Sequence, residues 1–255
     1  MMDQANTILS SGDILRKRSL TDEVYEYLSD KIIAGKYTVG DWLRQEDIST
    51  QLGVSQTPVR EALDRLVASG LAERVPYRGV RVPLLEPKEI VDAFFMRLIL
   101  ETTGVRLAAN TIQPEQVQEL AALVEKTAHL VTLEDMSTLR QLNKEFHTSL
   151  VEAARSPLLS KLYEITTNSF PDWMLYEYMF RHPELLRSSL QSEYLEHKGI
   201  VDALAAKNPE EAAAQVATHI KNLWHSLHSY LDIPNELIEE IEKHIITMFP
   251  NHHTH

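Results

Sequence analysis

Residues 52–63 read LGVSQTPVREAL, and this stretch decides the fold of the N-terminal part of the chain. Gly53 can adopt the left-handed conformation that ends a helix, and it follows the short helical pattern of residues 45–52. Ser55 can cap a second helix, and Pro58 lies in the first turn of that helix, where its missing N–H costs nothing. The stretch therefore predicts two helices joined by a tight glycine turn.

The sequence on either side predicts the remaining parts of a winged helix-turn-helix. Upstream, a helical pattern capped by Ser19 or Thr21 stops at Gly35. Downstream, residues 71–75 and 79–83 are short β-type runs around a turn, which predicts a hairpin. Three helices followed by a hairpin are typical of a winged helix-turn-helix domain.

The helix that begins after Ser55 has an apolar side and a polar N-terminal end. A glutamine at this end can bond to adenine in bidentate fashion, and an arginine can bond to guanine or to a phosphate. The same pattern also fits an ordinary helical hairpin with solvated polar residues, because helix-turn-helix patterns occur by chance. The polar residues outside the apolar stripe are Ser55, Gln56, Thr57 and Arg60, and the candidate positive face contains Arg44, Arg60, Arg78 and Arg81.

The distribution of charge permits a nucleic-acid partner although the whole chain is acidic. The 255 residues contain 25 Lys and Arg against 37 Asp and Glu, a formal charge of −12. Residues 1–83 contain 11 basic and 12 acidic residues, a net of −1, so the remaining −11 belongs to the second part. A near-neutral segment can still gather its positive residues on one face.

The composition also excludes several classes of protein. The chain has no cysteine, which excludes a disulfide scaffold, a thiolate zinc finger and a cysteine nucleophile. No apolar run approaches the roughly 18–20 residues that span a bilayer. The basic cluster 16–18 follows a mildly apolar stretch, the reverse of the order in a secretion signal. We therefore expect a cytoplasmic protein with no membrane partner.

The second part of the chain reads as one helix after another, so the predicted fold class is mostly α. Short connections predict an all-α antiparallel bundle. Pro171 should kink or break the fourth helix. The predicted spans are 87–110, 114–131, 135–154, 157–180, 183–206 and 209–231, with a seventh short helix over 234–248. The predicted domains are a flexible arm over 1–18 that either seeks phosphates or is merely solvated, a DNA-binding domain over 19–83, an effector-binding and dimerisation domain over 84–248, and a flexible tail over 249–255.

Four residues of this bundle have the types and spacing of a metal site. Asn143 and His147 lie one helical turn apart on one face, His197 lies in the fifth helix and His219 in the sixth. Three imidazoles and a carbonyl oxygen can converge on a divalent ion and leave room for water or a ligand oxygen. The chain has 11 histidines, however, so these three also fit hydrogen-bonded core or surface residues.

The first part resembles the GntR family of bacterial transcription regulators. The resemblance is carried by residues 43–45, 48–49 and 52–63, by the end of that helix at 66–71, and by the wing at 78–80. It implies a double-stranded DNA operator, with Gln56 where most relatives have arginine. The implied contacts are Ser55, Gln56, Thr57 and Arg60 in the major groove, with Arg78 and Gly79 at the wing tip.

The second part resembles the FCD ligand-binding domain of the FadR-type branch over residues 88–245. The matching pieces lie at 97–101, 143–147, 196–197 and 218–219, and six helices indicate the VanR-like subgroup. The resemblance implies a divalent metal, zinc first and nickel or manganese otherwise. Asn143 replaces the commoner Asp, so four neutral ligands should bind the cation more weakly and leave the site more positive towards an anion. The implied ligands are Asn143, His147, His197 and His219.

These features together predict a ligand-responsive regulator, most simply a repressor that a small carboxylate releases from DNA. The acid would bind the metal and touch Arg97, although pairing of Arg97 with Glu101 on the same helix face is the favoured alternative. A homodimer on a pseudo-palindromic operator is expected, because one recognition helix gives little specificity. Two alternatives are a metal sensor and a metal-dependent enzyme. The enzyme would lack an evident general base, because Glu145 and Glu196 should face away from the neighbouring histidines.

Overall fold

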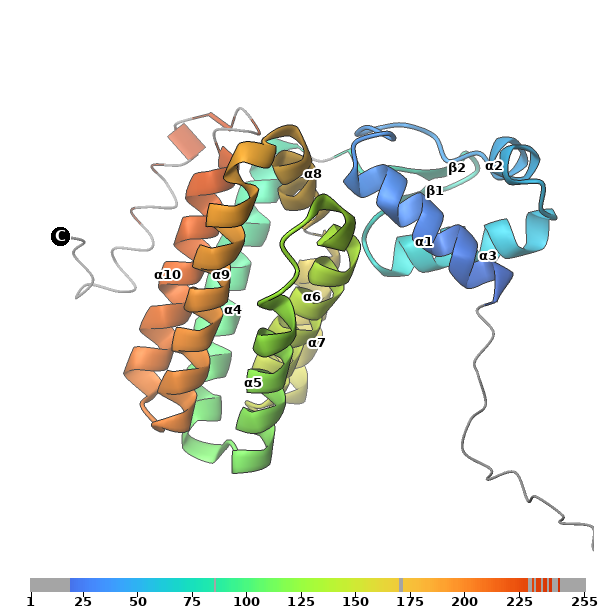
Figure 1. The fold of residues 1–255 in the computed structure, drawn as a ribbon. Coiled ribbons are helices and arrows are strands. Elements are labelled where there is room, and N and C mark those ends of the chain that lie inside the picture. The colour runs from blue at the N-terminus through green and yellow to red at the C-terminus, as the bar shows by residue number, and fades with distance from the viewer. Residues whose placement is uncertain are drawn as a thin grey trace, which may run out of the picture.

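The computed structural model describes residues 19–228 except 85, 170 and 171, together with a few positions between 231 and 243. Within this part the chain forms a small N-terminal unit and a bundle of long helices (Figure 1). The mostly α fold predicted from the sequence is confirmed, while the predicted arm over 1–18 and tail over 249–255 lie outside the described residues. The N-terminal unit consists of α1 (Leu20–Ile33), α2 (Gln45–Leu52), α3 (Gln56–Ala68), β1 (Glu73–Val75) and β2 (Gly79–Arg81).

Local sequence features place most boundaries of the N-terminal unit where they were predicted. Ser19 caps α1 through a reciprocal pair of hydrogen bonds with Asp22. Gly53 ends α2 with φ 65° and ψ 30°, the predicted left-handed conformation. Ser55 does occupy the N-cap position of α3, but its side chain makes no capping hydrogen bond, so that detail of the prediction is wrong. The strands β1 and β2 pair antiparallel as the wing.

The second unit is a helical bundle in which α4 is central. Its first turn contains Pro87, and α4 packs against α6, α7, α9 and α10. Among the described helices, none has both the length and the apolarity to cross a membrane. The remaining helices are α5 (Pro114–Thr127), α6 (Met136–Glu152), α7 (Pro157–Ser169), α8 (Trp173–Arg181), α9 (Pro183–Ala205) and α10 (Pro209–His228), while α4 itself spans Pro87–Thr111 and a 3-10 turn, η1 (Leu133–Asp135), precedes α6.

Two predictions about this bundle need correction or lie outside the described residues. The helix predicted over 157–180 is divided into two helices, α7 and α8. This division agrees with the expectation that a proline at position 171 kinks or breaks the helix. The described part of the bundle therefore contains seven α-helices, and the count of six that indicated the VanR-like subgroup is one too low. The helix predicted over 234–248 falls almost wholly on residues that are not described.

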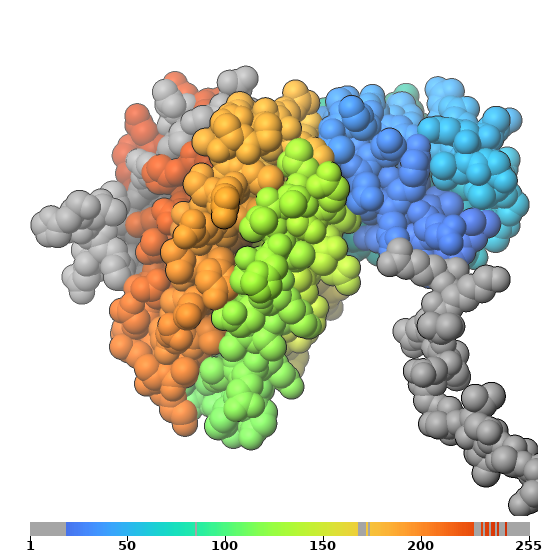
Figure 2. Space-filling view, in the orientation of Figure 1, coloured from blue at the N-terminus to red at the C-terminus, as the bar shows by residue number. Residues whose placement is uncertain are grey.

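The two units pack against each other, and most of their buried apolar side chains belong to one continuous cluster. Helix α1 contacts α6 and α8, so the N-terminal unit sits against one end of the bundle (Figures 1 and 2). Helix α2 lies on the side of the unit away from the bundle, whereas the C-terminal end of α3 approaches the bundle (Figure 1). The turn after α1 contains Gly35 with φ 64°, and a Cβ placed there would lie 3.0 Å from the Glu177 Oε1 atom of α8. The interface is therefore closely packed at this turn.

A buried arginine joins α3 to the bundle. Arg140 of α6 is 7% exposed. Its Nη2 atom donates to the main-chain oxygen of Ser69 at 3.0 Å and to Asp172 Oδ1 at 2.7 Å. Ser69 is the C-cap residue of α3. The C-terminal end of α3 is therefore bonded directly to a bundle helix.

Candidate functional site

The N-terminal end of α3 is the exposed polar surface that the sequence predicted. The inner side of the helix is buried through Val59, Ala62, Leu63 and Leu66. This packing fixes the opposite side of α3 towards solvent, where it can enter a DNA groove. The exposed residues at this end are Ser55, Gln56, Thr57 and Arg60.

The fold brings arginines from separate parts of the N-terminal unit into one groove. A groove of about 660 Å³ between α2, α3 and the wing is lined by Arg44, Arg60, Arg78 and Gly79. These residues are up to 35 positions apart in the chain and become neighbours only through the fold. At the wing tip Tyr77 is fully exposed with φ 62°, a residue that sequence reasoning did not select.

Ion pairing separates these arginines from the other arginines of the unit. Arg65 pairs with Asp22 at 2.6 Å, and Arg74 pairs with Asp64. Arg81, which the sequence placed on the candidate positive face, pairs with Glu73 at 2.6 Å. Arg74 also lines the groove, but within the part of the chain that the structure describes no acidic partner binds the other three groove arginines, Arg44, Arg60 and Arg78. Their charges are therefore available to phosphates or guanine edges.

Gln56 is already engaged before any DNA is present. Its side-chain oxygen accepts a hydrogen bond from Gln45 Nε2 at 3.2 Å, and its main-chain oxygen accepts from the same nitrogen at 3.1 Å. A bidentate contact to adenine uses both ends of the glutamine amide. Such a contact therefore requires the bond between the two side chains to be exchanged for the one to the base.

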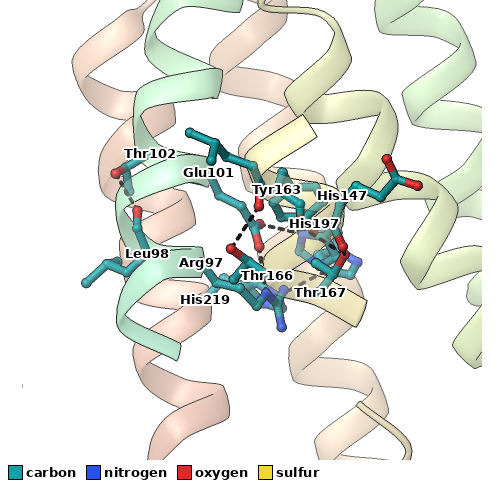
Figure 3. A network of polar contacts seen from close by, with 12 residues as sticks. Arg97, Leu98, Glu101, Thr102, His147, Tyr163, Thr166, Thr167, His197 and His219 are labelled. Carbon is teal, nitrogen blue, oxygen red and sulfur yellow. Dashed lines mark hydrogen bonds and ion pairs between the residues drawn. The ribbon is translucent and has the colours of Figure 1, made fainter. Parts of the chain in front are cut away.

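Inside the bundle, the fold brings the three predicted histidines together. His147 comes from α6, His197 from α9 and His219 from α10, and all three are buried. One ring nitrogen of each lies within 4.8 Å of the others, and the Nε2 atoms of His197 and His219 are 3.3 Å apart. Figure 3 shows the three imidazoles beside Glu101 and Arg97 of α4.

Carboxylates orient two of these rings in the way typical of metal ligands. Glu101 Oε2 lies 2.7 Å from His147 Nδ1, and Glu196 Oε2 lies 2.8 Å from His219 Nδ1. A carboxylate that accepts the Nδ1–H proton leaves the Nε2 lone pair for a cation. The prediction that Glu196 faces away from the histidines is therefore wrong. The Glu196 side chain does point away from His197 on its own helix, but its carboxylate contacts His219 on the neighbouring helix. Glu145 is exposed, as expected.

The spacing of the cluster fits a divalent ion. Two nitrogens bound to one zinc at about 2.05 Å in tetrahedral geometry are about 3.3 Å apart, which matches the measured separation of the Nε2 atoms of His197 and His219. Burial lowers the pKa of His147 and lowers that of His197 well below its ordinary value. Both imidazoles are therefore neutral near pH 7, the form that binds a metal.

Arg97 has the structural role that the sequence favoured. Its Nε atom donates to Glu101 Oε1 at 2.8 Å, and both side chains are buried. Burial alone would raise the pKa of Glu101, but Arg97 and then His147 outweigh it and hold this pKa well below its usual range. Glu101 is therefore ionised, and it connects the arginine to His147. Arg97 also lines a small cavity of about 50 Å³ beside the histidines.

Asn143 lines the same small cavity, but its amide nitrogen is engaged elsewhere. It donates to Glu193 Oε1 at 2.8 Å and to the Tyr176 hydroxyl at 3.1 Å, which leaves the amide oxygen for a cation. Burial raises the pKa of Glu193 to about 7. Glu193 therefore places a titratable carboxyl beside Asn143, next to the four predicted neutral ligands.

Comparison with known proteins assigns both units. Residues 20–82 match the bacterial regulatory proteins of the gntR family, and residues 92–222 match the FCD domain. The chain is 31% identical over 206 residues to the probable D-xylose utilization operon transcriptional repressor of Paenarthrobacter nicotinovorans, a match that covers 81% of this chain and 88% of that protein. The chain belongs to the GntR family of transcription regulators.

Other relatives of this GntR-family protein agree in sequence and in fold. The HTH-type transcriptional regulator McbR of Escherichia coli K12 is 29% identical over 192 residues, covering 75% of this chain and 85% of that protein. The solved structure of E. coli McbR/YncC has a TM-score of 0.59 at 24% identity and shows the same fold over 84% of this chain and 99% of that one. A GntR regulator from Rhodococcus sp. RHA1 has a TM-score of 0.56 at 25% identity, over 80% and 94% of the two chains.

Membership of the GntR family decides between the classes of function that the sequence left open. Regulators of this family bind DNA operators, and the relatives are transcription regulators rather than enzymes. The alternative of a metal-dependent enzyme is therefore removed.

Sequence reasoning missed three residues that surround the histidines of this GntR-family protein. Glu193 lies four residues before His197 on α9, and Arg140 lies three before Asn143 on α6, so helical spacing could have placed both on the inward faces. Tyr176 comes from α8, a helix that was not predicted as a separate element. Its contact with Asn143 joins residues 33 positions apart and has no local pattern.

Proposed function

We propose that this regulator is a homodimeric repressor that a small carboxylate releases from a pseudo-palindromic operator. In this proposal the acid binds a divalent metal ion in the FCD domain, and the resulting change in the bundle moves the recognition helix. A relative named as a transcriptional repressor supports the sign of the regulation. The domain limits are those predicted, with DNA binding by residues 19–83 and effector binding by 84–248.

The proposed DNA contacts follow from exposure and from unpaired charge. The N-terminal end of α3 would enter the major groove, and the wing would approach the adjacent backbone. Arg60 would bind a guanine or a phosphate, and Arg44 would bind a phosphate. The full proposed set is Ser55, Gln56, Thr57, Arg60, Arg44, Arg78 and Gly79.

The proposed metal site consists of His147, His197 and His219 with the amide oxygen of Asn143. Zinc suits three neutral imidazoles best, and nickel or manganese are alternatives. When bound, the ion supplies positive charge in a buried place, and this charge attracts a carboxylate. Glu101 and Glu196 orient two of the rings, which supports a metal over a purely structural cluster.

One observation supports the proposed link between acid binding and DNA binding: a single helix, α6, contains both a proposed metal ligand and a residue bonded to the end of α3. On α6, Arg140 bonds to the C-cap of the recognition helix, and His147 follows seven residues later. Two helical turns separate them, about 10 Å. Arg140 and His147 also line the same small cavity. A ligand that displaces α6 or competes for the guanidinium of Arg140 therefore acts directly on the end of α3.

The size of the required coupling is moderate. A 100-fold change in operator affinity requires the acid to discriminate between the two arrangements by about 2.7 kcal/mol. One charge-assisted hydrogen bond contributes about 1.5–3 kcal/mol. A single contact that exists in only one of the two arrangements is therefore sufficient.

An exposed apolar stripe on α7 supports a dimer. Leu158 is 68% exposed, Leu162 is 41% exposed and Ile165 is 55% exposed, and their spacing places them on one helix face. Lys161 and Glu164 flank this stripe, so two antiparallel copies of α7 would place unlike charges opposite each other. A second copy of the chain is therefore the proposed partner, and light scattering of a Leu162→Glu variant tests it through loss of the dimer.

The proposed function is tested by titration of an operator complex. The operator is first selected from random DNA with the purified protein. Zinc, nickel or manganese is then added with and without small carboxylic acids, while operator binding is followed. Release only by metal and acid together supports the proposal, whereas a response to metal alone supports a metal sensor. His197→Ala should lose metal and response but keep operator binding, and a fully metallated, fully responsive variant would contradict the site.

The link through α6 has its own test. Arg140→Gln removes the charge that holds Ser69 and Asp172, and we expect the effect of the acid on operator binding to change by about 0.5–2 kcal/mol with metal content intact. Arg106→Gln is the matched control, because Arg106 forms an exposed pair with Glu210 and has no bond to the N-terminal unit among those described. Equal responses in the two variants would remove Arg140 from the route.

A further inference from the structure

The first residues of α2 and α3 are joined through their side chains. Gln45 begins α2, and Gln56 begins α3 eleven positions later. The Gln45 Nε2 atom donates both to the main-chain oxygen and to the side-chain Oε1 atom of Gln56. Gln45 is half-buried and lines the groove between α2, α3 and the wing, whereas Gln56 is exposed. The more buried glutamine therefore holds the exposed one.

These two bonds fix the orientation of both amides. A main-chain carbonyl oxygen can only accept, so the end of the Gln45 amide that faces it must be the NH2 group. The end of the Gln56 amide that faces the same NH2 group must in turn be its oxygen. Among the bonds of the described residues, none engages the Gln56 Nε2 atom. Gln56 therefore offers two N–H donors to the surroundings while its oxygen is directed at Gln45.

A glutamine that offers only donors distinguishes the bases differently from a free glutamine. In the major groove, guanine shows two acceptors, thymine shows one acceptor beside its methyl group, adenine shows an acceptor beside an amino donor, and cytosine shows an amino donor. A free glutamine pairs with adenine because it uses both ends of its amide. A glutamine held by its oxygen meets an opposing donor on adenine and on cytosine, and only guanine gives it two acceptors.

The neighbouring side chains at this end of α3 favour the same base. Arg60 lies four residues after Gln56, on the same helix face. Its guanidinium has donors and no acceptor, and guanine is the base that such a group binds in bidentate fashion. The exposed start of α3 therefore presents donors at two successive positions of one face.

We propose that Gln56 reads guanine in the operator and that Gln45 is the positioning residue that fixes this choice. The proposal rests on the proposed function, because it takes from there the docking of this end of α3 in the major groove. Reading guanine keeps both bonds from Gln45, whereas bidentate reading of adenine breaks the bond to the Gln56 Oε1 atom. The arrangement of the unbound protein is therefore already the one that guanine requires.

The test measures base preference with the full-length chain. The operator selected from random DNA is varied to all four bases at each position, and the affinities of the parent and of Gln56→Ala are compared. The position at which the substitution removes discrimination is the one that Gln56 reads. We expect guanine there, bound about 10-fold more tightly than adenine or cytosine. A preference for adenine, cytosine or thymine at this position would overturn the proposal.

Gln45→Ala tests the positioning role. Without Gln45 the Gln56 amide can rotate, so the preference for guanine over adenine should fall by about 10-fold. Gln51→Ala on the same helix is the control, because Gln51 donates to the Tyr27 hydroxyl at 2.9 Å and has no bond to Gln56 among those described. A ratio of affinities for two bases does not depend on the fraction of folded protein, so a purely structural role would leave it unchanged. An unchanged ratio in Gln45→Ala would overturn the role of Gln45.

Gln45→Glu should reverse the reading. A carboxylate only accepts, so it would hold the Gln56 amide by its nitrogen and turn the oxygen towards the base. We expect the preference to move to adenine or cytosine, whose edges carry amino donors. A variant that still prefers guanine would contradict the fixed orientation of the amide.

The failure of this inference is distinguishable from the failure of the proposed function. If Gln56→Ala keeps both the affinity and the base preference of the parent at every position, the proposed docking of α3 is wrong, and this inference with it. If Gln56→Ala loses discrimination at a position where the parent prefers a base other than guanine, the docking stands and only the reading of guanine is wrong.

Discussion

The exposed N-terminal end of α3 and the buried histidine site both contain an arginine, in opposite surroundings. Arg60 is exposed and lacks an acidic partner within the described chain, whereas Arg97 is buried against Glu101. An exposed arginine stays hydrated until a phosphate displaces the water, so its charge remains available for binding DNA. A buried arginine has already lost its hydration on folding, and its charge holds neighbouring groups in place.

Because of this difference, a substitution at the exposed arginine should change the affinity for DNA, whereas one at the buried arginine should change the stability of the fold. Loss of a groove arginine leaves the core of the N-terminal unit intact, because that core is formed by the opposite side of α3. Loss of a buried partner in the bundle leaves an ion without compensation beside His147.

Arg97→Met is expected to destabilise the protein by about 3–5 kcal/mol, because it leaves the Glu101 carboxylate buried without its arginine. Denaturant unfolding of the metal-free protein measures the loss. Lys88→Met on the same helix is the matched control: Lys88 and Asp92 form an exposed pair with the same spacing, for which about 0.5 kcal/mol or less is expected. Similar losses in both variants would break the comparison.

Arg60→Ala is expected to weaken operator binding by about 1–3 kcal/mol if it reads a base, or to reduce the salt slope by about 1 if it holds a phosphate. Its stability should change little. Arg74→Ala provides the contrast, because Arg74 lines the same groove but is paired with Asp64. Equal losses in a binding titration at several salt concentrations would show that ion pairing does not separate the two arginines.

Glu196→Gln is expected to lower metal affinity by about 10–100-fold, because it removes the charged acceptor of the His219 Nδ1–H proton. Competition with a chelator measures the change. Glu145→Gln is the control on α6, since Glu145 is exposed although it stands close to His147 in the sequence. An unaltered affinity in the Glu196 variant would exclude this carboxylate from the support of the site.

Asp22→Asn is expected to have the smallest effect, a slight loss of stability near neutral pH that disappears at acidic pH. The hydrogen bonds from Ser19, and then Arg65, lower the pKa of Asp22 to about 2. A lowered folded-state pKa contributes stability above the unfolded value of about 4, and this contribution is lost as pH falls from about 4 towards 2. The variant should therefore lose less thermal stability than the parent between pH 5 and pH 2, and parallel melting curves would contradict this.

The sequence was sufficient where the structure depends on neighbours in the chain. The left-handed turn at Gly53, the start of α3 at Ser55 and the capping of α1 by Ser19 each rest on a few adjacent residues. The inward positions of His197 and His219 follow from helical periodicity, which continues over many residues. The resemblance to the GntR family added the expectation that these histidines meet.

The sequence was insufficient where the contact joins distant residues. Arg140 bonds to Ser69 across 71 positions, and Asn143 bonds to Glu193 across 50. Such contacts depend on how whole helices pack, and no local pattern of residues specifies them. The prediction for Glu196 was wrong for the same reason, because its orientation relative to its own helix was correct but the partner on α10 was not foreseen.

The absence of a side chain at Gly35 lets the turn after α1 pack directly on α8. The Glu177 carboxylate lies against the space that a Cβ would fill, and the φ of 64° favours glycine. A larger residue at position 35 would therefore have to displace Glu177 or open the contact between the two units, so the seating of the N-terminal unit on the bundle is sensitive to this one glycine.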